Sequence, residues 1–339
     1  MLTTQTSTEQ RAPYPRLREN LWHLDPVVGR ALLITPEAAF EVELPEAQRF
    51  LRMRSFCTGY HSMEEIAQLS GLPLEEVRSI LESLEAAQVL CAPPLPDRPL
   101  RPEDARQALL RVCQLWSEEL RRSYIGNELA QGALPRTVLL GWLLEMYHYV
   151  RDFPEAITLA AARSQGRLKE VLTRYAAQER GHELFLVRTL VNLGLTREEV
   201  EGSTPLVSTR LVGFLMRDLF ELEPASALMV AALVEAQEFN PSQIQAFQER
   251  VGELYGIPAD ALGPFFEHQR VDVQMGHAEL LAENLELVEI RESSKLDRVV
   301  NGLHDLKHAF DLQGLEIKDY YPVLGGKYFP RQPMTSGAI

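Results

Sequence analysis

The 339-residue chain has few cysteines, no long apolar run and a shortage of positive charge. Its three cysteines, Cys57, Cys91 and Cys113, lie too far apart for a C-x-x-C zinc motif, and their odd number does not fit a secreted disulfide scaffold. No stretch approaches the roughly 18 apolar residues of a membrane span, and the N-terminal segment lacks the apolar core of a signal peptide. We therefore expect a cytoplasmic protein with no membrane partner.

The shortage of positive charge also limits the other partners. Lysine and arginine total 34 against 48 aspartates and glutamates, which gives a formal net charge of -14. Nucleic acids recruit basic surfaces, so we do not expect the chain to bind them. The apolar content of 45% is enough for a sizeable core, and the length favours two domains.

A proline-rich segment, CAPPLPDRPLRPED from Cys91 to Asp104, marks the domain boundary. Proline cannot continue a helix and favours an extended chain. We predict a first domain at residues 1–92, a linker at 93–104, a helical domain at 105–325 and a C-terminal tail at 326–339.

The first domain has the pattern of a winged helix. The stretch ALLITPEAAFEVEL predicts two short strands with Pro36 in the turn between them. A capping box at Ser62 and Glu65 starts a helix that breaks at Gly71, and apolar residues at helical spacing follow. The second helix of this motif sets four glutamates against one arginine, Arg78, which is too acidic for a helix that reads a DNA groove.

This domain resembles the small peptide-binding winged helix of pyrroloquinoline quinone biosynthesis, which holds a peptide by adding it as a strand to a sheet edge. The resemblance rests on the pattern of the whole domain and on no single motif. It implies docking of a peptide-bound or carrier-bound substrate. A structural or dimerising module and a DNA reader stay open as alternatives.

The sequence downstream of the linker is helical nearly throughout. Its long amphipathic segments are broken by glycine or proline only at their ends, and we find no convincing internal repeat. We predict an all-α fold, a single helical domain preceded by the small winged helix.

Residue types that bind metals recur on these helices. In EMYHYV, Glu145 and His148 stand three residues apart on one helix face, which is the Glu-x-x-His spacing of carboxylate-bridged iron pairs. In FEHQRVDVQMGHAEL, His268 and Asp272 stand four residues apart and also share a face. Each pair alone is explained as well by an ordinary polar contact. Together they favour a metal site.

A third helix offers a carboxylate. Glu235 and Glu238 follow the apolar run SALMVAALV, where a buried carboxylate needs a partner, and Glu235 is the better candidate. A further Glu-x-x-His, formed by Glu179 and His182, leaves three interpretations open. In the first, the two residues line a pocket beside the metal; in the second, they lie on the surface; in the third, they bind the metal themselves.

The order and spacing of these residues resemble those of the haem-oxygenase-like diiron oxidases, which are related to pyrroloquinoline quinone synthase and thiaminase-like proteins. The resemblance spans Glu103 to Pro322. It implies a seven-helix bundle around two ferrous ions (Fe), and an iron- and dioxygen-dependent oxidoreductase in a biosynthetic pathway. The ligands that it implies are Glu145, His148, Glu235, His268, Asp272 and a last histidine.

The last histidine is displaced in this chain. The family places it three residues after the aspartate, where this chain has Met275, whereas His277 comes five residues after Asp272. On a regular helix His277 would be rotated by about 140° from Asp272. A π-bulge between Gln274 and Gly276 would return it to the site, so we predict His277 as the sixth ligand. Without such an irregularity the second iron would be weakly held.

The resemblance also implies the partners of the protein. These are dioxygen, a small amine, acid or amino-acid-like substrate that is free or bound to a peptide, and an external reductant. Two other functions stay open: a cofactorless oxidase similar to pyrroloquinoline quinone synthase, and a non-catalytic ligand-binding regulator. The sequence does not determine the substrate or the products. It also does not determine the oligomeric state, for which a homodimer is one option.

Overall fold

The computed structural model describes residues 15–17, 22–25, 29–34, 39–87, 89–91, 99–235, 240–258, 260–322, 330–333 and 336. The chain divides into two compact units, Met1–Pro96 and Asp97–Ile339. Half of the predicted linker and most of the predicted tail lie outside the described residues. Among the residues that are described, no helix is both long and apolar enough to cross a membrane.

The first unit consists of a three-stranded antiparallel sheet followed by three helices. The strands pair in the order β1 (Trp22–Asp25), β2 (Arg30–Ile34) and β3 (Ala39–Glu43). The helices are α1 (Leu44–Arg54), α2 (Met63–Ser70) and α3 (Leu74–Ala86). Their buried contacts centre on Met53, Ile66 and Val77.

Two local predictions for this unit are confirmed. The predicted strands pair as β2 and β3, although the turn with Pro36 lies outside the described residues. Both hydrogen bonds of the capping box between Ser62 and Glu65 are present, and α2 ends at Gly71 in the left-handed conformation. The winged helix is not confirmed. The strands precede the helices, and after α3 the described part of this unit adds only an isolated bridge from Leu90 to Leu17.

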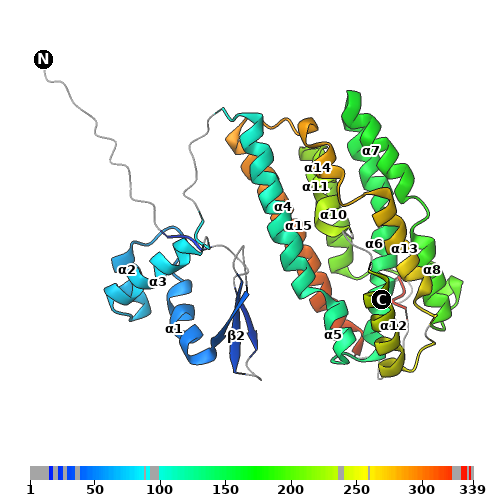
Figure 1. Ribbon diagram of the computed structural model, residues 1–339, viewed down its shortest axis with the longest axis horizontal. Helices are drawn as coiled ribbons and strands as arrows, with labels where there is room; N and C mark the ends of the chain where they lie inside the picture. The colour runs from blue at the N-terminus through cyan, green and yellow to red at the C-terminus, as the bar shows by residue number, and fades with distance from the viewer. Residues whose placement is uncertain are drawn as a thin grey trace, which may run out of the picture. The chain divides into compact units, whose positions relative to one another are not determined.

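The second unit is a helical bundle (Figure 1). Its helices are α4 (Pro102–Ser123), α5 (Ile125–Gln131), α6 (Arg136–Arg163), α7 (Gly166–Glu179), α8 (Glu183–Asn192), α9 (Arg197–Glu201), α10 (Val207–Leu222), α11 (Ser226–Val234), α12 (Pro241–Tyr255), α13 (Gly263–Met275), α14 (Leu280–Glu283) and α15 (Ser293–Tyr320). Helix α4 begins inside the predicted linker, because the fixed φ of Pro102 suits the first position of a helix.

The twelve helices described in this unit outnumber the seven that the resemblance implies, in part because segments predicted to be continuous are broken, two of them at glycines. One break separates α7 from α8 near Gly181, and the other separates α13 from α14 near Gly276. Both glycines have a positive φ, which glycine adopts without the steric cost that other residues bear. The two breaks determine the geometry of the site described below.

Helix α6 forms the centre of the bundle. It packs against α7, α8, α10 and α15, and in Figure 1 the helices α4 and α15 run side by side. Buried apolar side chains form two clusters, one containing Phe153, Tyr175 and Phe220 and the other containing Trp142 and Phe265. Tyr149 packs against both clusters. A group of buried polar side chains borders each of them.

Candidate metal centre

The end of α13 brings three of the predicted ligands together. His268 and Asp272 lie one turn apart, with 3.4 Å between Nε2 and Oδ2. The helix stops at Gly276, whose φ is 70°, and the N–H of His277 donates to the carbonyl of Asp272 at 3.3 Å. This helix-ending turn brings His277 back beside Asp272. The predicted irregularity therefore occurs at Gly276, as a helix end and not as a π-bulge.

The break between α7 and α8 adds a second pair. Glu179 is the last residue of α7, Gly181 has a φ of 91°, and His182 directly precedes α8. Nδ1 of His182 lies 3.4 Å from Oε2 of Glu179 and 3.2 Å from Oδ1 of Asp272. Both residues are buried. This Glu-x-x-His therefore faces the site and not the surface.

Helix α11 supplies the last carboxylate. Glu235 directly follows Val234 at the end of α11, and its Oε1 accepts a hydrogen bond of 2.7 Å from the hydroxyl of Tyr175. Glu238, the alternative in the sequence, lies outside the described residues.

Together these segments form two groups of potential metal ligands. Within each group, one nitrogen or oxygen atom of every residue lies within 4.8 Å of the others. Asp272 belongs to both groups. The first group is His182, His268 and Asp272, and the second is Glu179, Glu235, Asp272 and His277.

The donor atoms of this cluster fit a metal ion. Eight buried side-chain atoms in the described part of the chain have no hydrogen-bond partner, and six belong to the cluster: Glu179 Oε1, His182 Nδ1, His268 Nε2, Asp272 Oδ1, His277 Nδ1 and His277 Nε2. Glu179 Oε1 and His277 Nδ1 lie 2.8 Å apart, but without the angles of a hydrogen bond. Buried polar atoms are costly unless they find partners. Ions bound among them would supply those partners.

The charges of the cluster also favour a bound cation. Burial opposes ionisation of Glu179, but the neighbouring His182 and His277 outweigh it and lower the pKa of Glu179 to about 2. Burial likewise opposes charge on His182, yet Asp272 and Glu179 raise its pKa to about 10. For Glu235, burial and the nearby carboxylates raise the pKa well above its usual range. A cation at the cluster would offset this repulsion between carboxylates.

The structure places Glu145 outside both groups. This residue of α6 is fully buried, and its carboxylate accepts three hydrogen bonds. The donors are the backbone N–H of Leu206 at 2.9 Å and the hydroxyls of Thr209 and Tyr321, each at 2.6 Å. A carboxylate with three donors is already satisfied without a metal. It joins α6 to the start of α10 and to Tyr321, directly after α15.

His148 has a separate polar contact, which also lies outside the cluster. Its Nε2 lies 2.9 Å from the hydroxyl of Ser203, which itself donates to the carbonyl of Val200. Burial lowers the pKa of His148 to about 3, so the ring is neutral. Thus four of the six predicted ligands, Glu235, His268, Asp272 and His277, lie in the cluster, whereas Glu145 and His148 do not. Glu179 and His182 lie in the cluster instead.

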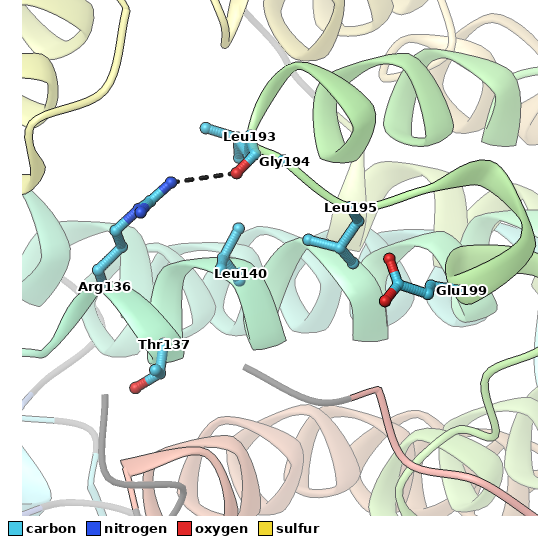
Figure 2. A pocket seen from close by; sticks show the side chains of 7 residues that line it. All are labelled: Arg136, Thr137, Leu140, Leu193, Gly194, Leu195 and Glu199. Carbon is cyan, nitrogen blue, oxygen red and sulfur yellow. Dashed lines mark hydrogen bonds between the residues drawn. The ribbon is translucent and has the colours of Figure 1, made fainter. Parts of the chain in front are cut away.

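A pocket of about 190 Å³ lies near the start of α6 (Figure 2). Figure 2 shows Arg136 donating to the carbonyl of Leu193, at 3.1 Å, with Leu140 and Leu195 nearby. None of the cluster residues lines this pocket. We therefore assign the pocket no part in the metal centre.

Comparisons with known proteins agree with the composition of the cluster. Residues 140–307, which include every residue of the cluster, match the family model described as "Iron-containing redox enzyme". No curated protein matches the chain.

One solved structure identifies the fold. A domain of unknown function with a heme oxygenase-like fold from Shewanella denitrificans OS217 is 18% identical and aligns with a TM-score of 0.53, covering 68% of this chain and 98% of that one. A TenA homolog from Pseudomonas syringae pv. tomato is 14% identical, with a TM-score of 0.44 and coverage of 62% and 92%. The first of these confirms the predicted haem-oxygenase-like fold.

Proposed function

We propose that the protein is a non-haem diiron oxidase, a proposal supported by the match of residues 140–307 to the iron-containing redox enzyme model. It uses dioxygen and an external reductant to oxidise a small amine, acid or amino-acid-like substrate. The observation that carries this proposal is the convergence of six buried, unpartnered nitrogen and oxygen atoms from two parts of the chain, residues 179–182 and 268–277. Imidazole and carboxylate together suit ferrous iron with open positions.

The two ligand groups give each iron its own set of residues. His182 and His268 would hold one ion, and Glu179, Glu235 and His277 would hold the other. Asp272 belongs to both groups, so its carboxylate would contribute to both sites. Iron bound in this way supplies redox chemistry with dioxygen.

The surrounding side chains keep these ligands in place and limit the access of water. The ring of Tyr175 lies edge-on to His277, with 4.9 Å between ring centroids, and the ring of Phe185 lies 5.8 Å from that of His268. Glu179, Asp272 and His277 are nearly inaccessible to solvent. Fixed ligands in a dry site reduce the reorganisation that a redox reaction needs.

Anaerobic loading with ferrous iron, followed by exposure to oxygen, tests the proposal. We expect two irons per chain and a transient visible absorption that appears only with oxygen. A protein that oxidises its substrate while binding no iron would instead be a cofactorless oxidase. A protein that binds iron but consumes no oxygen with any candidate substrate would be a binding protein.

Replacing His277 with alanine should reduce bound iron from two ions towards one, because His277 belongs to only one of the ligand groups. Oxidation should be lost, since it needs both ions. Metal analysis and oxygen consumption measure the two effects. Met275→Leu is the matched control, because the Met275 side chain is exposed and lies outside both groups. Two irons and full activity in His277→Ala would exclude His277 as a ligand.

For the first unit, we propose that it docks a peptide or carrier that bears the substrate. The order β1-β2-β3 leaves β3 as an outer strand, to which an extended peptide can add. Phe40 on this strand is 52% exposed and offers an apolar contact.

Deleting Met1–Pro96 should leave iron binding intact, because every candidate ligand lies in the second unit. Turnover of the natural, carrier-bound substrate should fall, through a higher KM. The same substrate freed from its carrier should be oxidised equally by both forms. Steady-state kinetics with the two substrates makes this comparison. Unchanged KM for the carrier-bound substrate would make the first unit a structural module.

A further inference from the structure

Tyr175 contacts two residues of the candidate metal centre that come from different parts of the chain. Its hydroxyl donates to Glu235 Oε1 at 2.7 Å, and its ring lies edge-on to the ring of His277 at an interplanar angle of 66°. The side chain is fully buried. We infer that Tyr175 is a positioning residue that fixes Glu235 and His277 for the iron of the second ligand group. This inference rests on the proposed function.

Helix α7 presents Tyr175 and a ligand together. Tyr175 and Glu179 stand four residues apart on α7, so their side chains share one face of the helix. The helix that contributes Glu179 therefore also contributes the hydroxyl that holds Glu235. Movement of α7 would displace both together.

Glu235 depends on this contact because its own backbone constrains it weakly. The N–H of Glu235 still donates to the carbonyl of Ala231, as in a helix. The ψ angle of Glu235 is 149°, which is extended, so Glu235 is the residue at which the helix ends. In the described part of the chain, the hydrogen bond that the structure gives its carboxylate comes from Tyr175. A long side chain at a helix end has several rotamers, and a single strong hydrogen bond selects one of them.

The hydrogen bond leaves coordination sites free. A carboxylate has about four lone-pair positions, and Tyr175 uses one of those on Oε1. Oε2 stays available to iron. Loss of the hydroxyl would free the carboxylate to rotate, and the second iron would be held less tightly.

Tyr175→Phe tests the inference because it removes the hydroxyl and keeps the ring. The variant is loaded anaerobically with Fe(II), and in parallel with Co(II), whose visible bands report the coordination of each site. Removing an outer partner of a metal ligand typically weakens metal binding about 10-fold to 100-fold, and we expect this loss for one of the two ions. The Co(II) bands of that ion should shift, whereas the other ion should bind as in the wild type.

Tyr321→Phe is the matched control. Tyr321 is also fully buried, and its hydroxyl donates at 2.6 Å to a buried glutamate, Glu145, outside the metal centre. It should bind both ions as the wild type does, even if its melting temperature falls. Wild-type affinity and wild-type Co(II) bands in Tyr175→Phe would overturn the inference.

A second variant keeps the inference testable if Tyr175→Phe does not fold. Because Tyr175 acts through Glu235, Glu235→Ala should weaken the binding of the same ion, and the Co(II) bands of that ion should shift or disappear. A Glu235→Ala protein that keeps both ions at wild-type affinity overturns the inference. A wild-type protein that binds no metal would instead contradict the proposed function itself.

Discussion

The Asp272→Asn variant is expected to lose both irons. Asp272 is the residue common to the two ligand groups, and its carboxylate lies within 4 Å of His182, His268 and His277. A neutral amide is a much weaker ligand for a divalent ion. Removing an outer partner alone costs about 10-fold to 100-fold in metal affinity, so losing a ligand shared by both ions should cost more than about 100-fold.

Metal analysis after anaerobic loading and desalting measures this loss. Circular dichroism should show an unchanged helical content, because Asn keeps the size of the side chain. Glu267→Gln is the control, since it removes a carboxylate from the exposed face of the same helix, α13. An Asp272→Asn protein that retains two irons would show that Asp272 is not the bridge.

Glu145→Ala is expected to lower stability without removing iron. The substitution leaves three buried donors, from Leu206, Thr209 and Tyr321, without their acceptor. Unsatisfied buried groups cost about 1 to 3 kcal/mol each, and we expect the free energy of unfolding to fall by roughly 3 to 5 kcal/mol in total. For a unit of this size the melting temperature should drop by about 10 °C.

Thermal unfolding of the apo-protein measures the stability, and metal analysis at low temperature measures the iron. The comparison with Glu179→Ala is informative, because both glutamates are buried and both belong to a Glu-x-x-His. Glu179→Ala should lose iron. Should Glu145→Ala lose iron while keeping its melting temperature, the assignment of the two glutamates would have to be exchanged.

The contrast between the two Glu-x-x-His pairs shows the limit of the sequence. Spacing alone gives both pairs the same geometry on a helix. The structure separates them through their surroundings: Glu145 lies within the continuous helix α6, whereas Glu179 ends a helix that Gly181 breaks. The partners of Glu145 are 61 to 176 residues away along the chain, and helical periodicity cannot indicate such distant contacts.

A dipeptide in the sequence distinguishes the Glu-x-x-His pair that lies in the cluster from the one that does not. The dipeptide Gly-His occurs twice, as Gly181-His182 and as Gly276-His277. In both places the glycine has a positive φ, and the histidine that follows it turns into the cluster. A glycine inside an amphipathic helical segment, directly before a histidine, is thus a physical reason to prefer Glu179 and His182 over Glu145 and His148.

Local features of the fold were the easiest to predict. The helical unit, the strands β2 and β3 and the capping box at Ser62 follow from patterns within a few residues. The break between α7 and α8 at Gly181 was not predicted. One glycine lowers the stability of a helix by only about 1 kcal/mol, so a helix often continues through it. At Gly276 the irregularity was predicted, because the displaced histidine required it.

Anomalous diffraction at the iron edge, from crystals of the iron-loaded protein, tests the central claim most directly. The account predicts two iron positions, both within coordination distance of Asp272. One should also contact His182 and His268, and the other Glu179, Glu235 and His277. Iron beside Glu145 and His148, or no iron at the cluster after loading, would contradict it.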